Sequence, residues 1–255
     1  MHNPYLDVTS EGSVWSMRNP LRSAHTDPAA ALDAYEKTIL AAPQQRLHTD
    51  PVVHAYAITA RRCGFHREHL VAFFSSMRAD LTHREYSPSE LQDYIYGSAE
   101  AIGLLCLQIF LAEENVSPAD RAAMERGARA LGSAFQKINF LRDLREDSST
   151  LGRTYFQQAP SGRIDEATKS ALIAEIRREL ATAALTIDLL PASARVGVSA
   201  AADIFAELTN RLAATPATAL STTRVSVPNH TKAWLAARAV RRRGHSSQTS
   251  LTGEN

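Results

Sequence analysis

Residues 87–112, with the sequence SPSELQDYIYGSAEAIGLLCLQIFLA, contain the signals that decide the fold. Ser87 is followed three residues later by Glu90, which is the pattern of a capping box at the first turn of a helix. The second half of the stretch is apolar apart from Gln108. It is shorter than the roughly 20 apolar residues that cross a bilayer. We therefore predict one helix over 88–112 that is buried in a protein core.

The rest of the chain repeats the same start signal, a capping side chain placed directly before a proline. It occurs at Asp27, Asp50 and Ser117, and Asp165 opens a further segment. Only residues 224–227 alternate polar and apolar side chains, and this stretch is too short to build a sheet. The pattern predicts an all-α fold with helices over 28–42, 51–62, 66–83, 88–112, 118–146, 166–190, 193–214 and 228–243.

The composition is that of an ordinary globular protein, with 44% hydrophobic and 22% charged residues. We predict one helical domain over 27–243, with poorly ordered ends over 1–26 and 244–255. Cys63 and Cys106 both lie in apolar helical segments, so we expect reduced core thiols and a cytoplasmic protein. The 28 basic and 27 acidic side chains balance. No basic patch with interleaved aromatic residues occurs, so we predict no nucleic-acid partner.

One segment, residues 136–147 (QKINFLRDLRED), places oxygen-bearing side chains at helical spacing. Side chains three or four residues apart share one face of a helix. Mg²⁺ prefers hard oxygen ligands and leaves coordination positions for substrate phosphates. The segment therefore predicts a magnesium site built from Asn139, Asp143 and Asp147, with Gln136 one turn earlier on the same face.

The alternative is a solvated face on which Arg142 and Arg145 neutralise the acids, as for most aspartate pairs at this spacing. The following loop, residues 151–156 (LGRTYF), favours the site, because Arg153 is suited to bidentate contact with phosphate.

Two long stretches resemble one family in particular. Residues 130–156, ALGSAFQKINFLRDLREDSSTLGRTYF, closely resemble the second aspartate-rich signature of the squalene/phytoene synthase family. Residues 77–110 resemble the helices that precede this signature, in the form found in bacterial phytoene synthases. The resemblance extends from about Pro28 to about Val240, and includes residues 223–228 (TRVSVP) near the end.

The resemblance implies an all-α, single-domain isoprenoid-synthase-type bundle around a central cavity. Members of this family join two allylic diphosphates head to head, with magnesium drawing off diphosphate. For this chain it implies two molecules of geranylgeranyl diphosphate as substrate, a cyclopropyl diphosphate intermediate and phytoene as product, in carotenoid biosynthesis. Mg²⁺ is the implied cofactor, with Mn²⁺ as an alternative, and no protein partner is identifiable.

The resemblance also implies roles for single residues. The metal ligands would be Asn139, Asp143 and Asp147, with both aspartates taking part in catalysis. The diphosphate would lie near Gln136, Arg142, Arg153 and Arg224, and Tyr155 would close that end. The family helix that lines the cavity matches Tyr94, Ser98, Ile102 and Gly103, and an acidic position in the helix before it matches Asp80. For Tyr94 and Ile102, plain core packing is an equal alternative.

The chain departs from the family pattern in its first part. The first aspartate-rich motif is expected just upstream of Ala29, and Asp7, Asp27 and Asp33 are not spaced for one helical face. Phe205 also stands where many members have tyrosine. We therefore expect the N-terminal helices to be missing and activity to be impaired. The alternatives are a non-catalytic relative that binds a prenyl ligand or a protein, and a class I terpene cyclase, against which the order of the signatures argues.

The last helix ends in a basic cluster. Arginines near a helix C-terminus complement the helix dipole and are usually solvated. Contact with anionic lipid, and so peripheral association with a membrane, is the alternative. The cluster consists of Arg238, Arg241, Arg242 and Arg243.

Overall fold

The computed structural model describes residues 27–83, 85–144 and 164–246. Over these residues the chain forms helices and no β-strand, which confirms the all-α prediction. None of the helices in the described ranges is long and apolar enough to cross a bilayer. The elements are α1 (Pro28–Ala41), η1 (Ala42–Gln44), α2 (Pro51–Cys63), α3 (Arg67–Thr82), α4 (Pro88–Ile95), η2 (Tyr96–Glu100), α5 (Ala101–Phe110), α6 (Pro118–Arg142), α8 (Glu166–Ile187), α9 (Ala192–Ala214), α10 (Ala217–Leu220) and α11 (Asn229–Ser246).

The helices begin at the predicted caps. At α4 both bonds of the capping box form: the Ser87 amide donates to Glu90 Oε2 at 2.8 Å, and the Glu90 amide donates to Ser87 Oγ at 3.3 Å. The hydrogen bonds from Ser87 hold the pKa of Glu90 below its usual value. The side chains of Asp27, Asp50 and Asp165 likewise accept bonds from the first turns of their helices.

The predicted helix over 88–112 contains an unpredicted π-helical turn, η2, between α4 and α5. Gly97 lies in this turn, and a Cβ there would come within 2.1 Å of the Ala72 carbonyl oxygen of α3. The Tyr94 carbonyl accepts hydrogen bonds from the hydroxyls of Ser76 (3.1 Å) and Ser98 (2.6 Å). The wider turn therefore allows close backbone contact with α3. Such turns are frequent at functional sites.

The apolar run of α5 is buried on one face only. Leu104, Leu105 and Leu107 are buried, whereas Ile102 and Ile109 are 37% and 45% exposed. The predicted core helix therefore has one face in the core, where α3 and α6 make most of its contacts, and one face that is partly exposed. The two cysteines are free thiols as predicted, but Cys63 is half-buried and Cys106 is exposed, so the expectation that they lie in the core was wrong.

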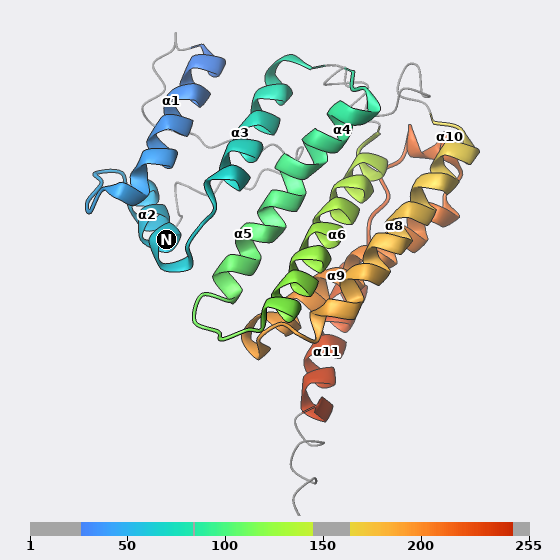
Figure 1. Cartoon of the computed structure of the whole chain (residues 1–255). Coiled ribbons are helices and arrows are strands. Elements are labelled where there is room, and N and C mark those ends of the chain that lie inside the picture. Colours follow the sequence, from blue (N-terminus) through green and yellow to red (C-terminus); the bar gives the residue numbers. More distant parts are fainter. Residues whose placement is uncertain (1–26, 84, 145–163, 247–255) are drawn as a thin grey trace, which may run out of the picture.

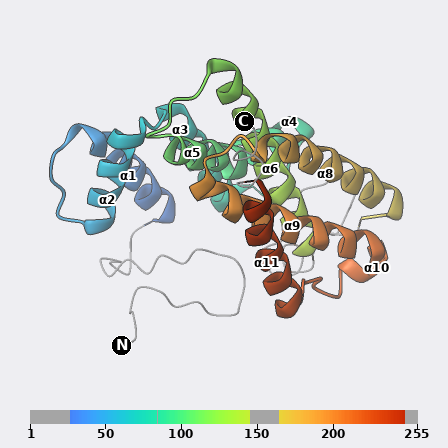
Figure 2. The same ribbon diagram turned by 90° about the horizontal axis from the view of Figure 1, so that it is seen from below.

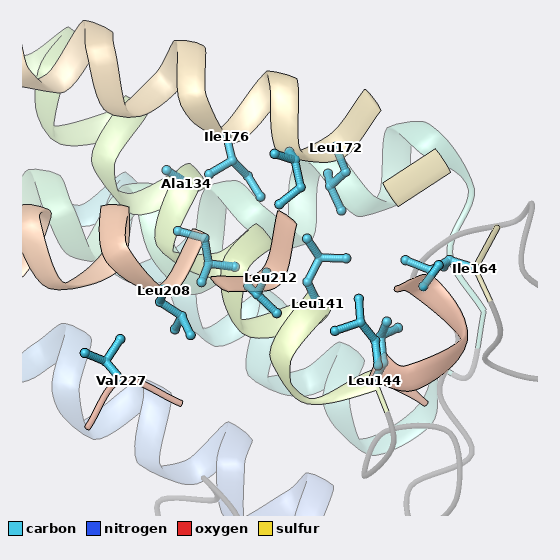
Figure 3. Packing of buried hydrophobic residues seen from close by; sticks show 13 residues of the cluster. Ala134, Leu141, Leu144, Ile164, Leu172, Ile176, Leu208, Leu212 and Val227 are labelled. Atoms are coloured by element: carbon cyan, nitrogen blue, oxygen red, sulfur yellow. The ribbon is translucent and has the colours of Figure 1, made fainter. Parts of the chain in front are cut away.

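The long helices lie side by side (Figure 1). Helices α1 and α2 form one edge of the molecule. Helix α3 comes next, followed by α4 and α5, which continue one another through η2, and then by α6, on which α8 packs. Seen from below, α9 and α11 lie with α8 at the other edge (Figure 2). The largest apolar cluster joins α6, α8 and α9, where Ile138, Leu141, Ile176 and Leu212 are fully buried (Figure 3). This core fixes the C-terminal end of α6.

Candidate diphosphate and metal site

The candidate site lies at the C-terminal end of α6. This helix ends at Arg142, four residues before the predicted end, because Asp143 leaves the helical region with φ −102° and ψ 10°. The Asp143 amide still donates to the Asn139 carbonyl at 2.9 Å, so the two side chains remain one turn apart. The other predicted residues of the signature, Asp147, Arg153 and Tyr155, lie outside the described residues.

The Asp143 carboxylate lies between two arginines. Arg142 Nε donates to both of its oxygens at 3.0 and 3.2 Å, and Arg142 Nη2 contacts Oδ2 at 2.5 Å. From the segment before α11, Arg224 Nη2 approaches Asp143 Oδ1 at 3.2 Å. The Asp143 side chain is 15% exposed and that of Arg224 is 46% exposed. Among the described residues, two guanidinium groups on one carboxylate leave a net positive charge, which favours an additional anion.

Asn139 adds an oxygen on the preceding turn. Its Oδ1 atom is buried and has no hydrogen-bond partner among the described residues. Leaving a buried polar atom unsatisfied costs about 1–3 kcal/mol. Gln136 is half-buried and lies one turn further toward the start of α6. A buried amide oxygen and a carboxylate at consecutive turns are the hard donors that Mg²⁺ selects, so these residues fit the implied cation.

Two of the predicted cavity residues form a pair between α3 and α4. Tyr94 Oη donates to Asp80 Oδ1 at 3.0 Å. The Tyr94 ring is 7% exposed and packs on Phe140 of α6, with ring centroids 6.1 Å apart. Because Phe140 follows Asn139 in the chain, the Asp80–Tyr94 pair is connected to the candidate site through an aromatic contact.

The other predicted cavity residues have different surroundings. Ser98 donates to the Tyr94 carbonyl within the π-helical turn. Gly103 packs on the backbone of α6, where a Cβ would lie 2.7 Å from the Ala128 carbonyl oxygen. Ile102 is exposed at 37%. Core packing was the alternative to cavity lining for Tyr94 and Ile102. It describes Tyr94, which is buried, better than Ile102, which is exposed.

Phe205 of α9, where the family resemblance leads us to expect a tyrosine in many members, stacks on Phe135 of α6. The ring centroids are 3.8 Å apart and the planes are inclined by 20°. Phe135 directly precedes Gln136, so this stack lies next to the oxygen-bearing residues of the helix. Two phenyl rings supply an apolar surface here, without a hydroxyl group.

One charged cluster on α6 was not predicted. Lys137 Nζ contacts Glu175 Oε1 at 2.7 Å and Glu179 Oε1 at 2.5 Å, and Ser133 Oγ donates to Glu179 Oε1 at 2.8 Å. The Lys137 side chain is 11% exposed. Burial raises the pKa of Glu179, although the bonds from Lys137 and Ser133 oppose this. The sequence indicates this cluster through the spacing of Glu175 and Glu179, which places both side chains on one face of α8.

A family model described as "Squalene/phytoene synthase" matches residues 21–231. "Phytoene synthase 3, chloroplastic" from Zea mays is 43% identical over 86 residues, or 32% of this chain and 19% of the maize protein. The chain therefore spans about a fifth of the length of this curated relative.

Two solved structures share the fold. The squalene synthase HpnC from Alicyclobacillus acidocaldarius superposes with a TM-score of 0.58 at 21% identity, covering 87% of this chain and 76% of that protein. A dehydrosqualene synthase solved in complex with a ligand superposes with a TM-score of 0.68 at 19% identity, covering 84% of this chain and 78% of that protein.

Proposed function

This chain belongs to the squalene/phytoene synthase family, and from that premise we propose that it couples two prenyl diphosphates head to head at the C-terminal end of α6. The observation that carries the proposal is the Asp143 carboxylate held between Arg142 and Arg224, one turn from Asn139 Oδ1, which has no hydrogen-bond partner in the part of the chain that the structure describes. This arrangement offers oxygen donors to a cation and guanidinium groups to an anion.

The roles of the residues follow from their chemistry. Asn139 and Asp143 would hold Mg²⁺, which when bound makes diphosphate a better leaving group. Arg142 and Arg224 carry guanidinium groups, which form bidentate bonds with phosphate oxygens, so they would hold the diphosphate. Arg142 and Arg224 thus bind the leaving group, and Asp143 occupies its place in the free protein.

The aromatic side chains near the site would protect the reaction from water. Phe135 and Phe205 form an apolar stack beside Gln136, and Tyr94 and Phe140 pack together beside Asn139. An allylic cation is quenched by water, so a dry surface favours attack by the second prenyl chain. The substrate we propose is geranylgeranyl diphosphate and the product is phytoene, because the maize relative is a phytoene synthase and the sequence resembles bacterial phytoene synthases.

The test is incubation of the purified chain with labelled geranylgeranyl diphosphate and Mg²⁺, followed by extraction of hydrocarbon. Farnesyl diphosphate is run in parallel and distinguishes the prenyl chain length. Replacement Asp143→Asn should lower the rate of product formation about 100-fold or more, since it removes a carboxylate that would hold the Mg²⁺ acting on the leaving group. The matched control is Asp188→Asn, at the exposed C-terminal cap of α8, which should leave the rate unchanged.

The same experiment tests the two other predictions for this chain. If the chain is an impaired enzyme, it should form product far more slowly than an active phytoene synthase, and Asp143→Asn should still lower the rate. Binding of substrate by equilibrium dialysis without any product supports the non-catalytic relative. If Asp143→Asn and wild-type protein form product equally fast, the proposed site is wrong.

A further inference from the structure

A second group of potential metal ligands lies at the start of α3, in the sequence His66-Arg67-Glu68-His69. One ligand atom from each of His66, Glu68 and His69 lies within 4.8 Å of the other two. The two imidazole rings are stacked, with centroids 5.5 Å apart, and His66 Nδ1 lies 3.8 Å from Glu68 Oε1. The side chains of His66 and Glu68 are 61% and 73% exposed, so both are free to adjust around an ion.

The backbone that carries His66 is held in place by α5. Gly64 ends α2 in the left-handed region with φ +64°, where a side chain would be strained. The Gln108 amide group donates to the Gly64 carbonyl at 2.9 Å, and its oxygen accepts from the His66 amide at 3.5 Å. The His66 side chain makes no capping bond to α3. The turn is therefore fixed while the imidazole stays available.

The His69 ring is held by a hydroxyl group from the π-helical turn. His69 is 7% exposed, and its Nδ1 lies 3.1 Å from Tyr96 Oη. Its ring forms no other hydrogen bond with the described residues, which leaves Nε2 for a ligand. A histidine that binds a metal commonly uses its second ring nitrogen for such an orienting bond. Arg129 lies over the Tyr96 ring at 5.5 Å and pairs with Glu100, so the tyrosine is itself held in position.

We propose that His66, Glu68 and His69 bind a divalent transition-metal ion of the zinc class, at a site distinct from the oxygen donors of Asn139 and Asp143. Two imidazole nitrogens and one carboxylate are a donor set that suits Zn²⁺ and leaves a fourth position for water. Mg²⁺ prefers oxygen donors alone, so it does not compete for these ligands. Tyr96 is a positioning residue for this site.

The experiment uses the full chain after treatment with a chelator, titrated with Co²⁺ and followed by visible absorption, with Zn²⁺ added in competition. The wild-type protein should develop the absorption bands of four-coordinate Co²⁺ at one equivalent, and Zn²⁺ should remove them. His66→Ala should weaken binding more than about tenfold, and Tyr96→Phe about tenfold, since loss of an orienting partner typically costs 10–100-fold. His230→Ala, at an exposed position in α11, is the matched control and should bind like wild type.

Three results would overturn the site: no four-coordinate bands, equal affinity in His66→Ala and wild type, or loss of binding only in Asp143→Asn. Circular dichroism of His66→Ala separates a lost ligand from a lost fold, and the exposed position of His66 predicts an unchanged spectrum. Competition by millimolar Mg²⁺ would also contradict the assignment.

Discussion

Helix α6 carries two charged clusters that differ in sign. On the face toward α8, Lys137 meets Glu175 and Glu179, which is one positive and two negative groups. At the end of the helix, Asp143 meets Arg142 and Arg224, which is one negative and two positive groups. Glu179 can take up a proton and remove its excess charge, whereas arginine keeps its charge at all ordinary pH values. The first cluster can balance its own charge, whereas the second carries an excess positive charge among the residues that the structure describes, which favours an anionic ligand.

The two clusters are buried to a similar extent, and they differ in which charge is exposed. In the first, Lys137 is 11% exposed and the exposed member is an acid, Glu175, at 45%; in the second, Asp143 is 15% exposed and the exposed member is a base, Arg224, at 46%. A ligand can therefore reach the guanidinium group of Arg224 from solvent, while the lysine is covered by α8. Charges on neighbouring turns of one helix thus serve two purposes: the inner cluster joins two helices, and the outer one is open to a ligand.

The largest effect is expected from Lys137→Met. The change leaves two glutamates partly buried without a cation, and breaking such a pair costs about 3–5 kcal/mol of the free energy of unfolding. Urea denaturation followed by circular dichroism measures it. The triple variant Lys137→Met, Glu175→Gln, Glu179→Gln removes the acids as well and should recover most of the loss. A single variant as stable as wild type would show that the cluster does not join the helices.

A smaller effect, on binding alone, is expected from Arg224→Gln. A charge-assisted hydrogen bond contributes about 1.5–3 kcal/mol, so KM for the prenyl diphosphate should rise roughly 10- to 100-fold. The unfolding midpoint should change little, because this arginine is nearly half exposed. Arg238→Gln, on the exposed side of α11, is the control of equal charge. Equal KM values for the two variants would remove Arg224 from the anion site.

The smallest expected effect is on how the stability of the protein depends on pH. Because burial raises the pKa of Glu179 in the folded protein, the folded state binds a proton more tightly than the unfolded state. Stability from this source is present below the ordinary pKa of 4.5 and is lost as the pH rises through the raised value. Urea midpoints measured from pH 4 upward should therefore decline more in wild type than in Glu179→Gln. If the urea midpoints of wild type and Glu179→Gln changed with pH in the same way, Glu179 would not take up a proton in the folded protein, and the contrast between the two charged clusters would be wrong.

Local signals explain what the sequence could predict. The caps at Ser87 and Asp50 involve residues two or three positions apart, so the helix starts were visible in the sequence. The π-helical turn was not, because it depends on contact between Gly97 and Ala72 of another helix. The predicted end of α6 was too late because periodic spacing continues past Arg142, where the backbone leaves the helix.

The same distinction applies to the candidate site. Asn139 and Asp143 could be paired from their spacing alone. Arg224 could be placed near them only through the family resemblance, because no local rule connects residues so far apart in the chain. Lys137 was not assigned, since its partners lie on α8 and nothing in the sequence of α6 points to them.

The π-helical turn has a consequence for how this chain tolerates insertions and deletions. A π-helical turn contains one residue more than an α-helical turn, so it accommodates the extra residue without changing the direction in which the side chains of α5 point. Removing Ala99 should therefore convert it into an ordinary α-helical turn, with Leu104, Leu105 and Leu107 still facing the core. A one-residue deletion here should disturb the close backbone contact of Gly97 with Ala72 more than the packing of α5.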